Sequence, residues 1–93
     1  MITTVILSRK AQKDLKKLPR YIIEALAAWV ENVETDGLEE TRKIPGYHDE
    51  PLRGSRKGQR SIRLNRSYRA IYVIKSDQRV EFVSVEEVHN HEY

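Results

Sequence analysis

Basic side chains gather in one stretch of this 93-residue chain. From residue 53 to residue 69 the sequence contains seven basic residues and no acidic one, whereas residues 31–50 and the segment after residue 76 are mostly acidic. Arginine donates hydrogen bonds from a planar fork that fits phosphate oxygens, so the band is typical of a surface that faces a polyanion. A solvated strand-and-loop surface would carry the same charge pattern. The seven residues are Arg53, Arg56, Lys57, Arg60, Arg63, Arg66 and Arg69.

The C-terminal segment contains side chains that can transfer protons. His89, His91 and Tyr93 recur at every second residue, so all three leave one face of the chain if the segment is extended. Histidine donates or accepts a proton near neutral pH, and tyrosine donates a hydrogen bond or stacks on a base. A frayed polar tail is the alternative. We expect no metal and no cofactor, because His-x-His without a framework of carboxylates or cysteines is a weak metal motif.

These residue types fit the cleavage of RNA without a metal. A base removes the proton of a ribose 2′-hydroxyl, the oxygen attacks the adjacent phosphate, cations stabilise the added negative charge, and an acid protonates the leaving 5′-oxygen. On an extended strand, Arg69 shares a face with Ile71 and Val73. A cation on an apolar face needs a partner or a ligand. A carboxylate such as Glu81 is the structural alternative to a bound phosphate.

Two helices must lie between a first strand and the basic band. Residues 2–7 are rich in β-formers and predict a strand, after which Ser8 can cap a helix over residues 9–17. Pro19 suits the first turn of a second helix over residues 20–35, and Gly37 is a typical stop. Apolar residues at steps of three or four place one stripe on one face, and Trp29 belongs to it as a core residue. The stripe consists of Leu15, Leu18, Ile22, Leu26, Trp29 and Val33.

Residues 38–58 predict an irregular connection, with a short helical turn at 38–43 and a basic turn between Gly54 and Gly58. Three strands follow, at 59–64, at 68–75 and from residue 79 onward, and residues 86–93 can extend the last of them. The short connections predict an antiparallel meander. The fold class is therefore α+β: an N-terminal strand and a helical hairpin packed on a small antiparallel sheet, in a single domain spanning residues 1–93.

Composition narrows the class of protein further. Apolar residues make up 39% of the chain and charged residues 33%, which is typical of a packed globule. The chain has no cysteine, which excludes disulfides and thiolate chemistry. No apolar run approaches the roughly 20 residues that span a bilayer, and the first residues lack the layout of a signal peptide. We expect a cytoplasmic protein without a membrane partner.

Several stretches together resemble toxins of the RelE/HigB family, which are ribosome-dependent messenger-RNA endonucleases of type II toxin–antitoxin systems. Residues 8–19 resemble the opening helix of that superfamily. The resemblance covers nearly the whole chain, and the order and spacing of the motifs are more specific than any one of them. It implies the microbial-RNase-like α+β fold. The remaining motifs are residues 50–54 (EPLRG), 58–65 (GQRSIRLN), 68–72 (YRAIY) and 85–93 (VEEVHNHEY).

The resemblance also implies roles for individual residues. Arg69 matches the arginine that stabilises the scissile phosphate, and Arg63 matches a second phosphate-facing arginine. His91 and Tyr93 match a C-terminal acid/base and its orienting group, with His89 competing for the histidine role. Glu50 sits where YoeB-like members carry a general base, although a loop-stabilising acid is nearly as good a reading. The residues expected to bind RNA are Arg53, Arg56, Lys57, Arg60, Arg66 and His89.

The implied partners are a cognate antitoxin, the A site of the 70S ribosome and the messenger RNA within it. Binding to operator DNA is expected only through the antitoxin. The main alternative is a ParE-like member of the superfamily that poisons DNA gyrase, and a non-catalytic RNA-binding or ribosome-binding module is the other. The pair Arg63 and Arg69, with His91 and Tyr93, favours the nuclease, because a gyrase inhibitor does not need these residues.

Overall fold

Five strands form one sheet in the order β1-β5-β4-β3-β2, and the computed structural model describes residues 1–90. Neighbouring strands are antiparallel except β1, which runs parallel to β5. The α+β class, the helical hairpin and the meander are confirmed; the two-residue β2 and the parallel pairing were not predicted. The elements are β1 (Val5–Leu7), α1 (Arg9–Leu15), α2 (Arg20–Asp36), α3 (Leu38–Arg42), the 3-10 turn η1 (Pro45–Tyr47), β2 (Glu50–Pro51), the 3-10 turn η2 (Gly54–Arg56), β3 (Arg60–Arg63), β4 (Tyr68–Asp77) and β5 (Val80–Asn90).

The helix ends follow the expected signals, although the first strand and the first helix are shorter than predicted. The Ser8 hydroxyl accepts a hydrogen bond from the Ala11 amide at 3.0 Å and so caps α1. Pro19 precedes the first residue of α2, where its missing N–H leaves no helical bond unmade. Gly37 ends α2 with a φ of +89°, a conformation that favours glycine.

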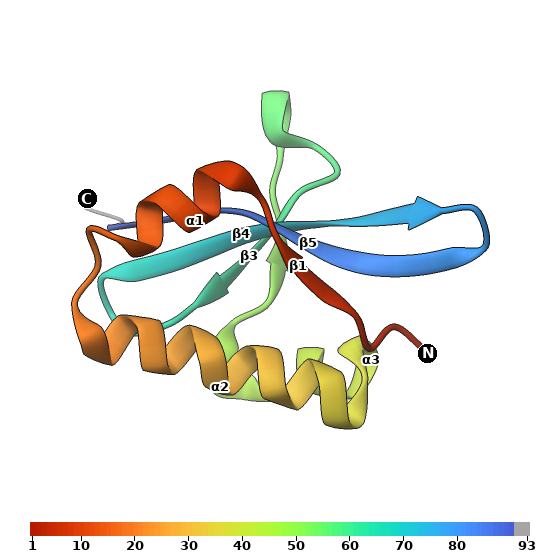
Figure 1. The fold of residues 1–93 in the computed structure, drawn as a ribbon, viewed down its shortest axis with the longest axis horizontal. Coiled ribbons are helices and arrows are strands. Elements are labelled where there is room, and N and C mark those ends of the chain that lie inside the picture. The colour runs from red at the N-terminus through yellow and green to blue at the C-terminus, as the bar shows by residue number, and fades with distance from the viewer. Residues whose placement is uncertain (91–93) are drawn as a thin grey trace.

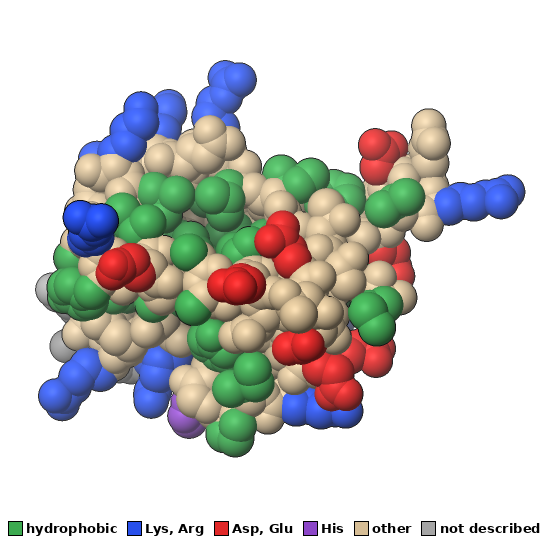
Figure 2. Space-filling model, turned by 60° about the horizontal axis from the view of Figure 1, so that its bottom comes forward, with side chains coloured by type: hydrophobic (Ala, Val, Ile, Leu, Met, Phe, Trp, Pro, Cys, Tyr) green, Lys and Arg blue, Asp and Glu red, His purple; other side chains and the backbone are tan. Residues whose placement is uncertain are grey.

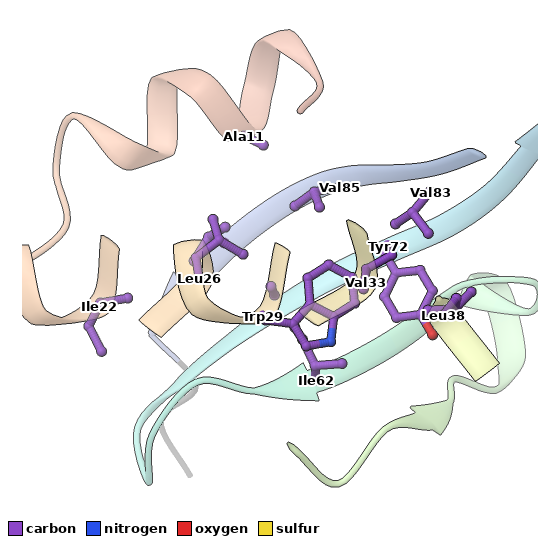
Figure 3. Packing of buried hydrophobic residues seen from close by; sticks show 12 residues of the cluster. Ala11, Ile22, Leu26, Trp29, Val33, Leu38, Ile62, Tyr72, Val83 and Val85 are labelled. Atoms are coloured by element: carbon purple, nitrogen blue, oxygen red, sulfur yellow. The ribbon is translucent and has the colours of Figure 1, made fainter. Parts of the chain in front are cut away.

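The core lies between α2 and one face of the sheet (Figure 3). The predicted stripe of α2 is buried, and Trp29 is a core residue as expected. Its ring packs against Tyr72 of β4 with centroids 5.3 Å apart and planes at 43°, a tilted arrangement worth about 0.5–1.5 kcal/mol beyond the area that it buries. The stripe thus fixes α2 on the face of the sheet that carries Tyr72.

Helix α1 covers the edge of β5 where β1 ends. The last pair between β1 and β5 is Leu7 with Val85. Beyond it, the Ser8 hydroxyl donates to the Glu86 carbonyl at 2.7 Å, and the Val88 amide donates to the Asp14 carboxylate at 2.9 Å. The side chains of Ser8 and Asp14 therefore replace a strand as partners of the β5 backbone, which leaves no unpaired amide at Val88.

A bulge in β5 decides which side chains of its second half face the core. Ile71 pairs with Glu87, but the next residue, Tyr72, pairs with Val85, so Glu86 has no partner across the ladder. Val85 and Val88 are both buried in the core although they are three residues apart. A one-residue shift moves the following side chains to the other face. The bulge therefore turns Glu87 and His89 away from the core.

The two faces of the sheet differ in what covers them (Figure 1). Helix α2 lies below the sheet in that view, and the green turn at residues 54–56 projects above it, beyond the opposite face. The hairpin of β4 and β5 extends past the other strands at one end. No helix within residues 1–90 is long and apolar enough to cross a membrane.

Candidate functional site

Three neighbouring strands bring two arginines and a histidine into one row. Arg63 of β3 pairs with Arg69 of β4, and Arg69 pairs with His89 of β5. Residues directly opposite each other in a sheet point to the same face, with Cβ atoms about 4.5–5.5 Å apart. These three side chains therefore lie side by side on the face away from α2. They come from parts of the sequence that only the antiparallel pairing brings together.

The next row along the strands completes a pocket. Glu50 of β2 pairs with Ser61 of β3, Ser61 pairs with Ile71 of β4, and Ile71 pairs with Glu87 of β5. The two rows form the floor and two walls of a cavity of about 590 Å³, with the β2 segment on one side and β5 on the other. Its lining residues are His48, Glu50, Leu52, Arg56, Ser61, Arg63, Arg69, Ile71, Glu87 and His89.

Arg63 and Arg69 are the two cations of the pocket floor. Both are partly buried, and no ion pair among residues 1–90 includes either of them. Arg69 donates from Nη1 to the carbonyls of Asn65 at 3.0 Å and Tyr68 at 3.3 Å. Glu81 is not its partner, because Glu81 pairs with Ser76 toward the other end of β4. The Arg63 Nε is buried and has no hydrogen-bond partner in the described chain. Like charges directly opposite each other are destabilising unless an anion lies between them.

Glu87 is the anionic group on the β5 wall. Its carboxylate accepts hydrogen bonds from Arg56 Nη2 at 3.3 and 3.4 Å, and its Oε1 lies 3.7 Å from the Nε2 of His89. Arg56 is thereby neutralised in part, whereas Arg63 and Arg69 are not. Glu87 therefore lies within reach of both a guanidinium group and an imidazole on this wall.

Asp49 anchors the β2 side of the pocket through side chains that lie on the opposite, core-facing side of the sheet. Its side chain is 1% exposed and accepts from the Tyr72 hydroxyl and from Arg60 Nε, both at 2.6 Å. We call these three residues the Asp49 clamp. Burial raises the pKa of the Tyr72 phenol, and the hydrogen bond to Asp49 raises it further. The neighbours of Asp49, His48 and Glu50, line the pocket instead.

The clamp separates Arg60, one of the residues expected to bind RNA, from the pocket. Arg60 pairs with Tyr72 in the ladder and shares its face, whereas Ser61 and Arg63 point to the pocket face. Its side chain is 20% exposed and is committed to Asp49. The band of seven basic residues is therefore not one surface, because strand alternation divides it between two faces.

The remaining expected site residues surround the pocket or lie outside the described chain. Arg56 and His89 line the cavity. Arg53 and Lys57 are exposed on either side of η2, and Arg66 is exposed in the turn between β3 and β4. His91 and Tyr93 lie outside the described residues.

Sequence reasoning missed His48, Ser61 and Glu87 as pocket residues. Ser61 could have been found, because it is two residues from Arg63 on the same strand and therefore points to the same face, whereas Ile62 points to the other. Glu87 could not, since its orientation depends on the bulge.

The arrangement suits the binding of a phosphate between two groups that transfer protons. The arginines form the floor, Glu50 stands on the β2 side, and His89 with Glu87 stands on the β5 side. A carboxylate and an imidazole are general acid/base groups, and guanidinium groups stabilise an anionic transition state. Within residues 1–90, no three His, Cys, Asp or Glu side chains gather closely enough to hold a metal ion.

Comparisons with known proteins give the chain its family. Residues 5–88 match the family described as "ParE toxin of type II toxin-antitoxin system, parDE", whereas no curated protein sequence matches. The RelBE2 toxin–antitoxin complex of Mycobacterium tuberculosis has a chain that is 27% identical, with a TM-score of 0.65 over 99% of this chain and 100% of that one. The DinJ-YafQ toxin–antitoxin complex of E. coli has a chain that is 22% identical, with a TM-score of 0.70 over 97% of this chain and 94% of that one.

A third solved structure, a YoeB/ParE toxin from Agrobacterium tumefaciens, is 16% identical with a TM-score of 0.68 over 96% of this chain and 99% of that one. The two structures below 25% identity show a shared fold. The family match spans nearly all of the sheet and both long helices. The chain therefore belongs to the ParE toxin family of type II toxin–antitoxin systems, within the RelE/ParE superfamily.

Proposed function

We propose that this toxin is a metal-independent endoribonuclease that cuts messenger RNA in the ribosomal A site. The observation that carries the proposal is the pair Arg63 and Arg69, which face each other at the pocket floor without an ion-pair partner in the described chain. A phosphate between them would remove their repulsion and would supply acceptors for guanidinium donors.

The two walls of the pocket supply the proton transfers. Glu50 takes the proton of the ribose 2′-hydroxyl, and the oxygen attacks the adjacent phosphorus. Arg63 and Arg69 stabilise the added negative charge, and a histidine on the β5 side protonates the 5′-oxygen as its bond to phosphorus breaks. The products are a 2′,3′-cyclic phosphate and a 5′-hydroxyl end. His91 is our candidate for the acid and Tyr93 for its orienting group, with His89 as the alternative acid.

Exposed basic side chains hold the RNA around this pocket. Arg53, Arg56, Lys57 and Arg66 contact phosphates of the messenger or of ribosomal RNA, so binding weakens as salt rises. We propose a cytoplasmic location, since the ribosome is the site of action. A cognate antitoxin neutralises the toxin, as the solved complexes of similar toxins with their antitoxins support, and operator DNA is bound only through it.

Primer extension on a defined messenger in a purified translation system tests the nuclease. Wild type, Glu50→Gln and His91→Ala are compared with and without ribosomes. We expect cuts at A-site codons that need ribosomes and that weaken by roughly 10²–10⁴-fold in each variant, the range of a lost general acid or base. An intact messenger with normal translation would contradict the proposal.

Inhibition of DNA gyrase is the second candidate, because the family that matches residues 5–88 is that of ParE toxins. A supercoiling assay with purified gyrase tests it directly. Inhibition that persists in Glu50→Gln and Arg69→Ala, together with an intact messenger, would favour this function over the nuclease.

A further inference from the structure

His48 lies in the pocket but has no part in the proton transfers proposed above. It follows η1 directly and adopts a left-handed conformation, with φ +45° and ψ +48°. Among residues 1–90 only one other non-glycine residue, Gln78, has a positive φ. Side chains with a Cβ rarely adopt this region, and glycine would adopt it without strain. Such strain persists where the surrounding structure enforces it, and it concentrates at functional positions.

The two chain neighbours of His48 hold it in this conformation. The Tyr47 hydroxyl accepts a hydrogen bond from Asn32 of α2 at 3.1 Å, and its ring packs against the hydrophobic core. Asp49 is held by the clamp on the same side of the sheet. Because both neighbours are anchored on the core side, the left-handed turn directs the His48 side chain to the pocket, where it is exposed.

The chemistry of the pocket gives this ring a partner. His48 and His89 are the only aromatic rings among its described lining residues, and they stand on opposite walls with the arginine pair between them. Single-stranded RNA exposes the faces of its bases, which stack on aromatic side chains, histidine included. A phosphate bound at the arginine pair brings the adjoining base to one wall or the other.

We propose that the His48 imidazole stacks on a nucleobase next to the phosphate bound by Arg63 and Arg69, and thereby helps to select where RNA is cut. The inference rests on the proposed nuclease function for its biological meaning. Stacking itself requires neither cleavage nor a ribosome, so it can be tested on the isolated chain.

The first experiment is an NMR titration of the full chain with adenosine 3′-monophosphate, guanosine 3′-monophosphate and inorganic phosphate. We expect the nucleotides, but not phosphate, to move the His48 ring proton resonances upfield, as a stacked base does. His48→Gly and His48→Asn should weaken nucleotide binding by roughly fivefold to a hundredfold, the range of one lost stacking contact, and should leave phosphate binding unchanged. Equal shifts with phosphate and nucleotides would overturn the proposal.

Gln78 provides a matched control because it has the same backbone conformation in the turn between β4 and β5, outside the pocket. We expect His48→Gly and Gln78→Gly both to keep or raise the midpoint of urea unfolding, because each relieves a left-handed residue. Only His48→Gly should lose nucleotide affinity. A similar loss in both variants would contradict a specific role for His48.

His48→Phe separates stacking from proton transfer. The phenyl ring stacks but carries no proton, so nucleotide affinity should return to within a few fold of wild type, whereas His48→Asn stays weak. If His48→Phe folds but nucleotide affinity does not return, stacking is overturned. If His48→Phe does not fold, the upfield shifts of the His48 ring resonances in the wild type test the proposal instead. Nucleotide binding with an intact messenger would refute only the nuclease, whereas an unchanged cutting pattern in His48→Gly would refute only the role of His48.

Discussion

At the scale of single residues, the decisive feature is that two arginines occupy one rung of the sheet without a carboxylate between them. Arg63 and Arg69 come from adjacent strands and lie directly opposite each other, and like charges in this position destabilise the fold. Nearby cations are treated differently: Arg56 contacts Glu87 and Arg60 contacts Asp49. Two nearby cations are thus paired with carboxylates, whereas Arg63 and Arg69 have no ion-pair partner among residues 1–90.

Arg69→Ala should lower the rate of messenger cleavage by roughly 10²–10³-fold while leaving ribosome binding within a few fold, because a transition-state donor is lost. Lys57→Ala should do the reverse, weakening binding and lowering its salt slope by about one unit or less. Single-turnover kinetics and ribosome co-sedimentation at several salt concentrations measure the two effects. Equal losses of binding and rate in Arg69→Ala would contradict a transition-state role.

Arg63→Met should stabilise the fold while abolishing cleavage. Removal of one of two facing charges relieves repulsion of roughly 0.2–1 kcal/mol, and methionine keeps much of the side-chain packing. Urea unfolding measures the change, with Arg66→Met as a control for an exposed arginine in the turn between β3 and β4. A loss of stability in Arg63→Met would mean that the pair is structural.

At the scale of elements, the site depends on how β5 and the segment before β2 are fixed. Strand β5 carries Glu87 and His89 beyond the end of β1, and α1 supplies its missing backbone partners. Strand β2 pairs over only two residues, so the Asp49 clamp secures the segment before it. Each wall of the pocket therefore rests on one aspartate: Asp14 for β5 and Asp49 for β2.

Asp14→Ala should destabilise the protein by about 1–3 kcal/mol, because it leaves the Val88 amide without a partner. Amide hydrogen exchange at Val88 should accelerate accordingly. Lys10→Ala removes only the exposed side of the ion pair between Lys10 and Asp14, so its effect should stay within about 0.5 kcal/mol. Equal effects of the two substitutions would show that the ion pair, and not the edge contact, is what matters.

Tyr72→Phe should cost about 1–3 kcal/mol at pH 8, because the Asp49 carboxylate loses a donor in a buried setting. The pKa of Tyr72 is raised by burial, so the folded protein keeps the phenol protonated where the unfolded chain ionises it. The contribution of Tyr72 is complete below the unfolded pKa of about 10 and falls as the pH rises above it. Urea unfolding at pH 8 and pH 11 should therefore show a smaller difference between wild type and Tyr72→Phe at the higher pH; a constant difference would refute the linkage.

At the scale of the whole molecule, the two sides of the sheet differ in the chemistry of their surfaces. The pocket side presents the arginine pair, whereas the helix side exposes apolar side chains in patches, with acidic side chains among them and Lys and Arg side chains toward the edges of the view (Figure 2). An apolar groove lies between α1 and α2, lined by Leu7, Leu15, Ile23, Leu26, Ala27, Val30, Glu31 and Glu34. An apolar groove between helices is a typical docking surface for an amphipathic helix.

We expect the cognate antitoxin to cover this groove in a 1:1 contact. Ile23 is 37% exposed and lines the groove, so Ile23→Asp should weaken the toxin–antitoxin complex by at least tenfold without changing messenger cleavage. Tyr21, which is 61% exposed but outside the groove, provides the control Tyr21→Asp. Calorimetry with the purified antitoxin measures both, and equal affinities for the two variants would place the contact elsewhere.

The sequence alone determined the three helices and four of the five strands, in their order along the chain. The apolar stripe of α2, the cap at Ser8 and the stop at Gly37 are local signals, because a helix depends on contacts three or four residues apart. Strand alternation also placed Arg69 on one face with Ile71 and Val73, but only the fold showed that this face lies opposite the core. Gly37 and Trp29 have the positions that were expected from their neighbours in the sequence.

The pocket itself was decided by tertiary structure. Strand register fixes which residues of β2, β3, β4 and β5 share a row, and one bulge reverses the orientation of Glu87 and His89. The Asp49 clamp joins residues 49, 60 and 72, and it withdraws Arg60 from the basic surface while presenting His48. Such contacts are non-local, so no pattern of neighbouring residues encodes them; they exist only once the sheet has formed.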